Sequence, residues 1–152
     1  MNKVFFDLEW NTGFLDGNSF DEIIEIGAVK TDEEYRQIDG FRRLIRPVIY
    51  RKMNPYIQKI LAITMKDLQG EEPLAAVAKV FFDWCGDCDT LIAWSGNDFG
   101  VLEKNLAHIG MKIPEQLGRY DVQMAYAYRT ENSIRNYALK TAVEAMELPE
   151  PE

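Results

Sequence analysis

The sequence predicts an α/β protein in which a mixed sheet is flanked by helices. Near the N-terminus, three segments rich in β-formers, at 4–10, 23–30 and 41–48, follow one another over short connections, as in an antiparallel meander. Later, the continuous apolar run TLIAWS at 90–95 is typical of a buried parallel strand, and helical patterns precede and follow it. Strands and helices in this order predict a single layered domain.

Each of the three N-terminal strands contains or precedes residues that favour an interruption of the strand. VFFDLEW is short and dense in β-formers, and a loop with glycines, NTGFLDGNSF, is expected to follow it. In IIEIGAVK, Gly27 is expected to mark a bulge or a close approach of the backbone. FRRLIRPV is expected to end as a strand at Pro47, which lacks the N–H that a sheet requires.

Five helical segments are expected after the meander. Asn54-Pro55 begins the first, over 54–68, and Pro73 stands at a first-turn position of the second, LAAVAKVFFDWC. After the apolar strand, Asn97 or Asp98 is expected to cap the third helix. The last two segments lie near 121–129 and 133–147.

Length and composition limit the class of protein. A chain of 152 residues is long enough for one domain with a proper core, so we expect 1–152 to be a single domain. No apolar run approaches the roughly 20 residues needed to span a bilayer. MNKVFFDLEW has neither an apolar h-region nor a cleavage site, and two cysteines do not make a disulfide scaffold. A cytoplasmic location and no membrane partner are therefore expected.

The net charge of −8 argues at first against a nucleic-acid partner, because phosphates attract lysine and arginine. The charge is unevenly distributed, however, since no Asp or Glu occurs from Gly40 to Lys66. The basic residues of this stretch are Arg42, Arg43, Arg46, Arg51, Lys52, Lys59 and Lys66. Two interpretations stay open: a solvated basic edge, or a basic wall beside an acidic site, which would suit a polyanionic substrate.

The sequence WCGDC at 84–88 is similar to a thioredoxin-type dithiol. In such a site the dithiol opens a helix, whose N-terminus stabilises the thiolate. Here Cys85 and Cys88 end a helical segment and precede a strand, where the helix C-terminus and nearby aspartates would raise a thiol pKa. His108 is the only histidine, so a zinc site is also incomplete. We expect a helix–strand turn, and a dithiol oxidoreductase is the third functional hypothesis.

FFDLEW carries two carboxylates in a strand pattern. Because strand side chains alternate, Asp7 and Glu9 lie on one face, about 7 Å apart, while Phe6, Leu8 and Trp10 lie on the other. Two carboxylates on an apolar strand are costly unless they meet solvent, pair with cations or bind metal ions. A sheet face that simply meets solvent is the plainer alternative.

A third carboxylate favours the metal hypothesis. Asp98 stands just past the end of the buried strand and at the start of a helix, a position where ligands bind in open α/β sheets, although a helix cap explains it too. Asp7, Glu9 and Asp98 together would form a hard-oxygen cluster suited to Mg²⁺ or Mn²⁺. Two such ions can activate a water and stabilise the leaving oxygen of a phosphodiester.

Three ordered motifs, VFFDLEW, DEIIEIGAVK and LIAWSGNDFGVLEKN, give the chain its resemblance to a known family. It resembles the DEDD-type 3′–5′ exonucleases of the ribonuclease H-like fold, and among them the KapD-like and histone-mRNA-type subgroup. TMKDLQG and VFFDWCGDCDTLIAW are similar to that family as well, which places WCGDC at an ordinary helix–strand junction. The resemblance implies a ribonuclease H-like sheet and hydrolysis of terminal phosphodiesters of single-stranded RNA or DNA, with two Mg²⁺ or Mn²⁺ ions.

The resemblance also implies roles for single residues. Asp7 would ligate both metals, Glu9 one of them, and Asp98 the second metal through water. Contacts with the 3′-terminal nucleotide are implied for Leu8, Trp10, Asn11 and Asn97. Trp10 and Asn11 stand where the family usually has threonines.

The family's third motif, His-x-x-x-x-Asp or Tyr-x-x-x-Asp, supplies a general base and a fourth carboxylate. It would follow the helix at 133–147, but the chain stops at PEPE, so we expect the domain to lack this last helix, through truncation or natural loss. Catalysis by these 152 residues is then expected to be impaired or absent. A non-catalytic nucleic-acid-binding or regulatory protein on the same scaffold is the alternative.

Two other acidic residues have counterparts in the family. Glu25 matches a recurrent glutamate, for which a catalytic role and a structural role in the strand both stay open. Asp121 matches an aspartate that usually lies outside the metal cluster.

Overall fold

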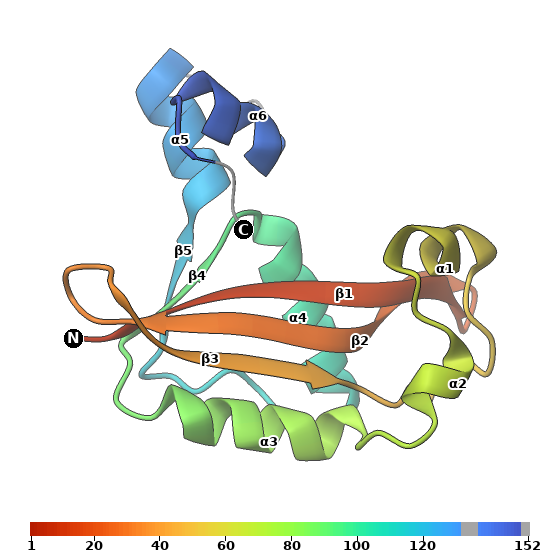
Figure 1. Ribbon diagram of the computed structural model, residues 1–152. Helices are drawn as coiled ribbons and strands as arrows, with labels where there is room; N and C mark the ends of the chain where they lie inside the picture. Colours follow the sequence, from red (N-terminus) through yellow and green to blue (C-terminus); the bar gives the residue numbers. More distant parts are fainter. Residues whose placement is uncertain (132–136, 150–152) are drawn as a thin grey trace.

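The computed structural model describes residues 1–131 and 137–149, which form a five-stranded mixed sheet flanked by helices (Figure 1). Its strand order is β3-β2-β1-β4-β5. The strands are β1 (Lys3–Leu15), β2 (Asn18–Thr31), β3 (Gln37–Leu44), β4 (Thr90–Ala93) and β5 (Gly118–Asp121). The first three form an antiparallel meander, and β4 and β5 add parallel strands beside β1. The predicted fold class is confirmed.

β1 and β2 form one long hairpin, so the predicted loop at 11–20 is wrong. Leu15 pairs with Asn18, and the two residues between them, Asp16 and Gly17, have φ values of 50° and 80°. Two positive φ values in a two-residue connection define a type I′ turn, for which Asp-Gly is a favoured sequence. The turn lets both strands continue through the segment that looked like a loop.

The register between β1 and β2 shifts at Glu9 and Trp10, where the ladder passes from Glu9–Glu25 to Trp10–Ile23. A bulge of this kind increases the local twist and redirects side chains. Gly27 is therefore not the bulge, contrary to expectation. It lies directly opposite Asp7, and a Cβ built on it would meet no atom within 4 Å.

One face of the sheet is buried under α3 (Leu74–Cys85) and α4 (Gly96–His108). Val4, Phe6 and Leu8 of β1 point into this core, each 5% exposed or less. The Phe6 ring packs edge-on against Phe99 of α4 at 5.1 Å, and similar aromatic contacts join β3 to α3. Burying each such side chain contributes roughly 1.5–3 kcal/mol, so the core fixes which residues of β1 face the other way.

The predicted helix at 54–68 is two short helices, α1 (Pro55–Leu61) and α2 (Met65–Leu68), near one end of the long hairpin (Figure 1). Ala62 ends α1 in the left-handed region, with φ of 53°. Thr64 then caps α2 through a capping box with Asp67, which explains why the helix restarts here.

Helix α4 is capped by Ser95, whose side chain accepts a hydrogen bond from the Asn97 backbone N–H at 3.1 Å. The predicted cap, Asn97 or Asp98, is therefore wrong by two or three residues. Because Ser95 performs this role, Asp98 is placed in the first turn of the helix and is not needed as its cap.

The C-terminal region contains β5, which was not predicted, and then α5 (Val122–Glu131) and α6 (Leu139–Ala145). The four residues GRYD have no apolar strand pattern, and they become a strand by pairing with β4. α6 confirms the last predicted helix over 139–145, whereas residues 133–136 of that prediction lie outside the described residues, as do 150–152. Within the described parts of the chain, no helix is long and apolar enough to span a bilayer.

The WCGDC segment is a helix–strand junction, as predicted. Cys85 ends α3, Gly86 follows with φ of 57°, and β4 begins at Thr90. Both thiols are buried and unpaired by a disulfide. Burial raises the pKa of Cys85 to about 12, which is the opposite of what a reactive dithiol needs.

Two buried polar side chains attach the segment 48–54 to the hairpin. The carboxylate of Glu22 accepts hydrogen bonds from the backbone N–H groups of Val48, Ile49 and Tyr50 at 2.6, 2.8 and 2.9 Å. The side-chain amide of Asn11 donates to a backbone carbonyl at 3.1 Å and accepts from the Asn54 N–H at 2.8 Å. Together they position the chain that leads into α1.

We expect Glu22→Ala to destabilise the fold by about 2–4 kcal/mol, because it leaves three backbone N–H groups without their charged acceptor. Urea unfolding followed by circular dichroism measures this change. Glu33→Ala, at an exposed side chain, serves as the control and should stay within about 0.5 kcal/mol of wild type. Equal urea midpoints for the two variants would refute the anchoring role of Glu22.

Candidate active site

Asp7 and Glu9 lie on the face of β1 opposite to the core, as the alternation predicts. They line a cavity of about 350 Å³, together with Glu25 and Gly27 of β2 and Arg42 of β3. The opposite wall is aliphatic and comes from α1 and the residues after it: Ile60, Leu61 and Ile63. We call this space the acidic cavity. One wall can contact an apolar or aromatic group, while the other presents negative charge.

Asp98 reaches the same region from α4. The parallel pairing of β1 with β4 ends at Phe5, so β1 continues beyond that point without β4 beside it. Asp98 is 6% exposed, and both its carboxylate and that of Asp7 approach the backbone N–H of Leu8. The structure thus brings two carboxylates distant in sequence to one amide group.

The pKa values of the three carboxylates show that their charges interact. Burial, and then the negative charge of Asp7, raise the pKa of Asp98 to about 6, against the lowering effect of the Leu8 N–H. Loss of solvent around the carboxylate raises the pKa of Asp7. The pKa of Glu9 is raised by partial burial and then by the charges of Asp7, Glu25 and Asp98. Such repulsion favours the binding of cations.

Glu25 has a different environment, because it forms an ion pair with Arg42. This pairing balances the charge of Glu25, and it is a contact that the sequence did not predict. No Lys or Arg pairs in this way with Asp7, Glu9 or Asp98 anywhere in residues 1–131 and 137–149. These three carboxylates therefore carry the uncompensated negative charge of the site.

The donor set suits a hard divalent cation, because it consists of carboxylate oxygens that repel one another. Among the described residues, no three His, Cys, Asp or Glu side chains are already arranged closely enough to hold a metal ion. The carboxylates thus share one neighbourhood without forming a closed coordination shell.

The four residues predicted to contact substrate differ in how exposed their side chains are. Leu8 is 3% exposed in the core and Asn11 is 1% exposed, with both ends of its amide bonded to the segment before α1. Neither side chain is accessible to a substrate, and these two predictions are corrected accordingly. Trp10 is half-buried against the core, whereas Asn97 is exposed next to Asp98.

Sequence reasoning missed part of the site. The aliphatic wall was not predicted, because apolar residues such as Ile60 and Ile63 in an expected helix over 54–68 indicate packing and do not by themselves indicate a site. Asp121 ends β5, accepts a hydrogen bond from the Met124 N–H at 3.0 Å, and its charge adds to the raised pKa of Asp98. The position of Asp121 at the end of a parallel strand would have indicated this proximity, had β5 been recognised.

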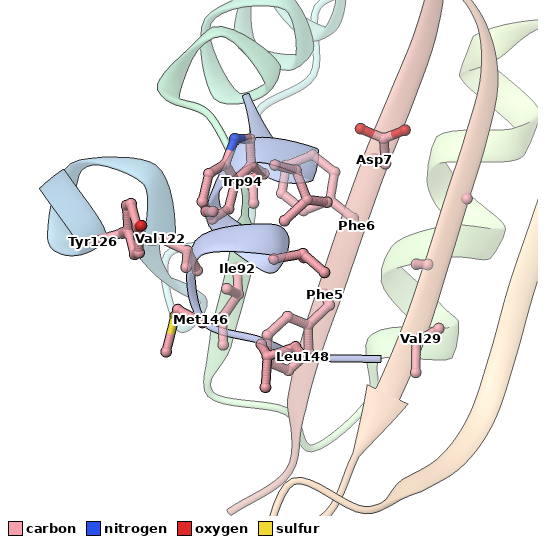
Figure 2. Close-up of a pocket in the computed structure, with 16 residues that line it drawn as sticks. Phe5, Phe6, Asp7, Val29, Ile92, Trp94, Val122, Tyr126, Met146 and Leu148 are labelled. Atoms are coloured by element: carbon pink, nitrogen blue, oxygen red, sulfur yellow. The ribbon is translucent and has the colours of Figure 1, made fainter. Parts of the chain in front are cut away.

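A larger, mainly apolar cavity of about 630 Å³ adjoins the acidic cavity. Figure 2 shows Phe5 of β1 and Ile92 of β4 on the sheet side of it, and Val122, Tyr126 and Met146 on the side of the C-terminal helices. Asp7 lies at its margin and lines both cavities. The face of the sheet that carries Asp7 therefore has an acidic part and an apolar part that meet at this residue.

Comparison with known proteins identifies the family. The RNase T family model, described as an exonuclease, matches residues 4–150. The chain is 34% identical over 112 residues to the PolC-type DNA polymerase III of Clostridium perfringens, a match that covers 72% of this chain and 7% of the polymerase. The chain thus spans a small fraction of that relative's length.

Solved exonuclease structures share the fold. A full-length 3′-exonuclease superposes with a TM-score of 0.80 at 14% identity, over 99% of this chain and 72% of that one. The nuclease domain of 3′hExo bound to rAMP gives 0.74 at 15% identity, over 97% and 79%. Exonuclease I of E. coli, in complex with a dT13 oligonucleotide, gives 0.72 at 16% identity, over 97% and 36%.

These likenesses confirm the ribonuclease H-like architecture, and the family model matches almost the whole chain. The chain belongs to the RNase T exonuclease family of nucleases.

Proposed function

We propose that this domain is a 3′–5′ exonuclease that removes terminal nucleotides from single-stranded nucleic acid with two divalent ions, Mg²⁺ or Mn²⁺. The observation that carries the proposal is the approach of Asp7 and Asp98 to the same Leu8 amide, with Glu9 on the same strand face. Asp7, Glu9 and Asp98 would hold the ions. When bound, such ions supply positive charge to the phosphodiester and lower the pKa of an attacking water.

The size and lining of the acidic cavity support the proposed binding of a terminal nucleotide. Its volume of about 350 Å³ and its aliphatic wall of Ile60, Leu61 and Ile63 suit an apolar base plane. The carboxylates on the opposite side would face the phosphate through bound cations. Two of the solved structures named above are bound to an adenosine monophosphate and to a thymidine oligonucleotide, which agrees with this substrate class without deciding between RNA and DNA.

Residues of this chain have different roles in the proposed site according to where they lie. Asp7 and Asp98 concentrate negative charge where the cations would lie, and the Leu8 N–H lowers the pKa of both carboxylates against the effect of burial. Arg42 holds Glu25 at the cavity wall. His108, the only histidine, packs against Phe20 at 5.6 Å and does not face the carboxylates. We therefore infer slow hydrolysis by this chain, and a binding protein without catalysis is the second candidate.

We expect Asp7→Asn to weaken Mn²⁺ binding about tenfold or more and to reduce hydrolysis of a 3′-labelled oligonucleotide by roughly 100-fold or more, because it removes a ligand at the centre of the cluster. Electron paramagnetic resonance counts free Mn²⁺ whether or not the chain is active, and gel analysis follows the loss of the 3′ nucleotide.

Asp87→Asn, at an exposed turn before β4, is the matched control and should leave both measurements unchanged. Metal-dependent removal of the 3′ nucleotide that survives Asp7→Asn would disprove the site. Specific Mn²⁺ binding without any hydrolysis would favour the second candidate.

A pH prediction follows from Asp98. Its pKa of about 6 in the folded chain exceeds the ordinary 3.8, so its contribution to stability is full at low pH and is lost as pH rises through 6. Asp98→Asn should therefore raise the free energy of unfolding at pH 8 by on the order of 2 kcal/mol and leave it nearly unchanged at pH 4. Urea unfolding in EDTA at both values measures this. A stabilisation that is the same at pH 4 and pH 8 would contradict the raised pKa.

Gly27 provides a steric test of the acidic cavity. A side chain at this position has open space around it but would enter the cavity beside Asp7. Gly27→Val should keep the fold stable, or stabilise it by up to about 1 kcal/mol, since valine favours strands. Binding of a mononucleotide with Mn²⁺, measured by calorimetry, should fall at least tenfold. The control is Gly40→Val in β3, outside the cavity; equal affinity in both variants would exclude the cavity as the nucleotide site.

A further inference from the structure

A third cavity, of about 440 Å³, lies between the connection that follows β3 and helix α2. We call it the basic groove. It contains two arginines between apolar and amide side chains, and its lining includes Arg46, Val48, Tyr50, Arg51, Met65 and Gln69. Tyr50 is fixed in place, because its hydroxyl donates to the Phe20 carbonyl at 2.9 Å. The groove thus has a rigid wall beside two long cationic side chains.

Neither arginine of the basic groove forms an ion pair with a carboxylate of the described residues, although Glu71 and Glu72 adjoin Arg46 through their backbone carbonyls. Arg46 donates its Nε–H to a backbone carbonyl, that of Glu71, at 3.1 Å. Asp67 of α2, which lies between the groove residues Met65 and Gln69 in sequence, accepts hydrogen bonds at one carboxylate oxygen from the N–H and hydroxyl of Thr64. In the described ranges 1–131 and 137–149, no carboxylate forms an ion pair with Arg46 or Arg51.

The basic groove and the acidic cavity are lined by neighbouring parts of the chain. Ile63 lines the acidic cavity and Met65 lines the basic groove, and the two residues are separated by Thr64 alone. Two residues of chain span at most about 7 Å, so the backbone at the edge of one space lies within that distance of the backbone at the edge of the other. The acidic cavity repels phosphates unless cations are bound, whereas the basic groove attracts them.

We propose that the basic groove binds the phosphodiester backbone of the nucleotides that precede the 3′ end of a single-stranded nucleic acid. This inference rests on the proposed function, in which the acidic cavity holds the terminal nucleotide. Arg46 and Arg51 contact successive phosphates, and Val48 and Met65 provide apolar surface for the bases or sugars. The contacts are to the backbone, so they are the same for RNA and DNA.

The test is the salt dependence of binding, measured by fluorescence anisotropy with 5′-fluorescein dT12 in EDTA, where hydrolysis plays no part. Each phosphate contact contributes about −0.7 to the slope of log K against log salt for a single strand. The double variant Arg46→Gln with Arg51→Gln should therefore reduce the slope by about 1.4, and Arg51→Gln alone by about 0.7. If replacing Arg46 disturbs the fold, the slope measured for Arg51→Gln alone still tests the proposal.

Arg36→Gln is the control, because it removes the same charge at the turn before β3, at the opposite end of that strand from the basic groove. It should leave the salt slope as in wild type. Equal slopes for wild type and Arg51→Gln, or no binding of dT12 even at 50 mM salt, would contradict the proposal that the basic groove binds the phosphodiester backbone. Binding that depends on Arg51, without any metal-dependent hydrolysis, would support the basic groove as a binding site and refute the proposed nuclease activity. The failure of one proposal can therefore be distinguished from the failure of the other.

Discussion

The alternation of side chains along β1 is the constraint on which the site depends. Val4, Phe6 and Leu8 must face α3 and α4, and a slip of one residue would move them to solvent and bury both carboxylates instead. The free energy of that core therefore holds Asp7 and Glu9 on one face in spite of their mutual repulsion. The pKa values of Asp7 and Glu9 are raised because burial and neighbouring negative charges make the ionised forms unfavourable. Carboxylates that folding brings together against their repulsion attract cations, which would relieve that repulsion.

The sheet supplies the third carboxylate through its mixed direction. β4 runs parallel to β1 but pairs with only three of its residues, so the helix after β4 begins beside the unpaired part of β1. Asp98 then lies where the Leu8 N–H is available, and β5 brings Asp121 to the same edge. The antiparallel hairpin and the parallel strands thus contribute different residues to one neighbourhood. Cavities on both sides of Asp7 leave this neighbourhood open to a ligand.

Patterns in the sequence were sufficient to predict four features: the meander, the buried strand, the shared face of Asp7 and Glu9, and the helix–strand junction at Cys85. They failed where a local rule was overlooked or a contact was non-local. The Asp16-Gly17 turn is a local signal that extends the hairpin, and the Thr64–Asp67 capping box is another. β5 and the buried amide of Asn11 depend on partners about 28 and 40 residues distant, Thr90 and Lys52, which no periodicity encodes.

Net charge is a poor guide to the ligand of this chain, because the charges are sorted by position. A phosphate responds mainly to charges within a Debye length of about 8 Å at physiological salt, so the total of −8 matters less than the residues that it meets. Carboxylates collect on β1 and at the ends of the parallel strands, whereas the chain from Gly40 to Lys66 has none. A polyanion could not use the first region without cations, nor could cations be held by the second. An acidic protein can therefore accept nucleic acid, provided that metal ions and basic side chains each neutralise a different part of it.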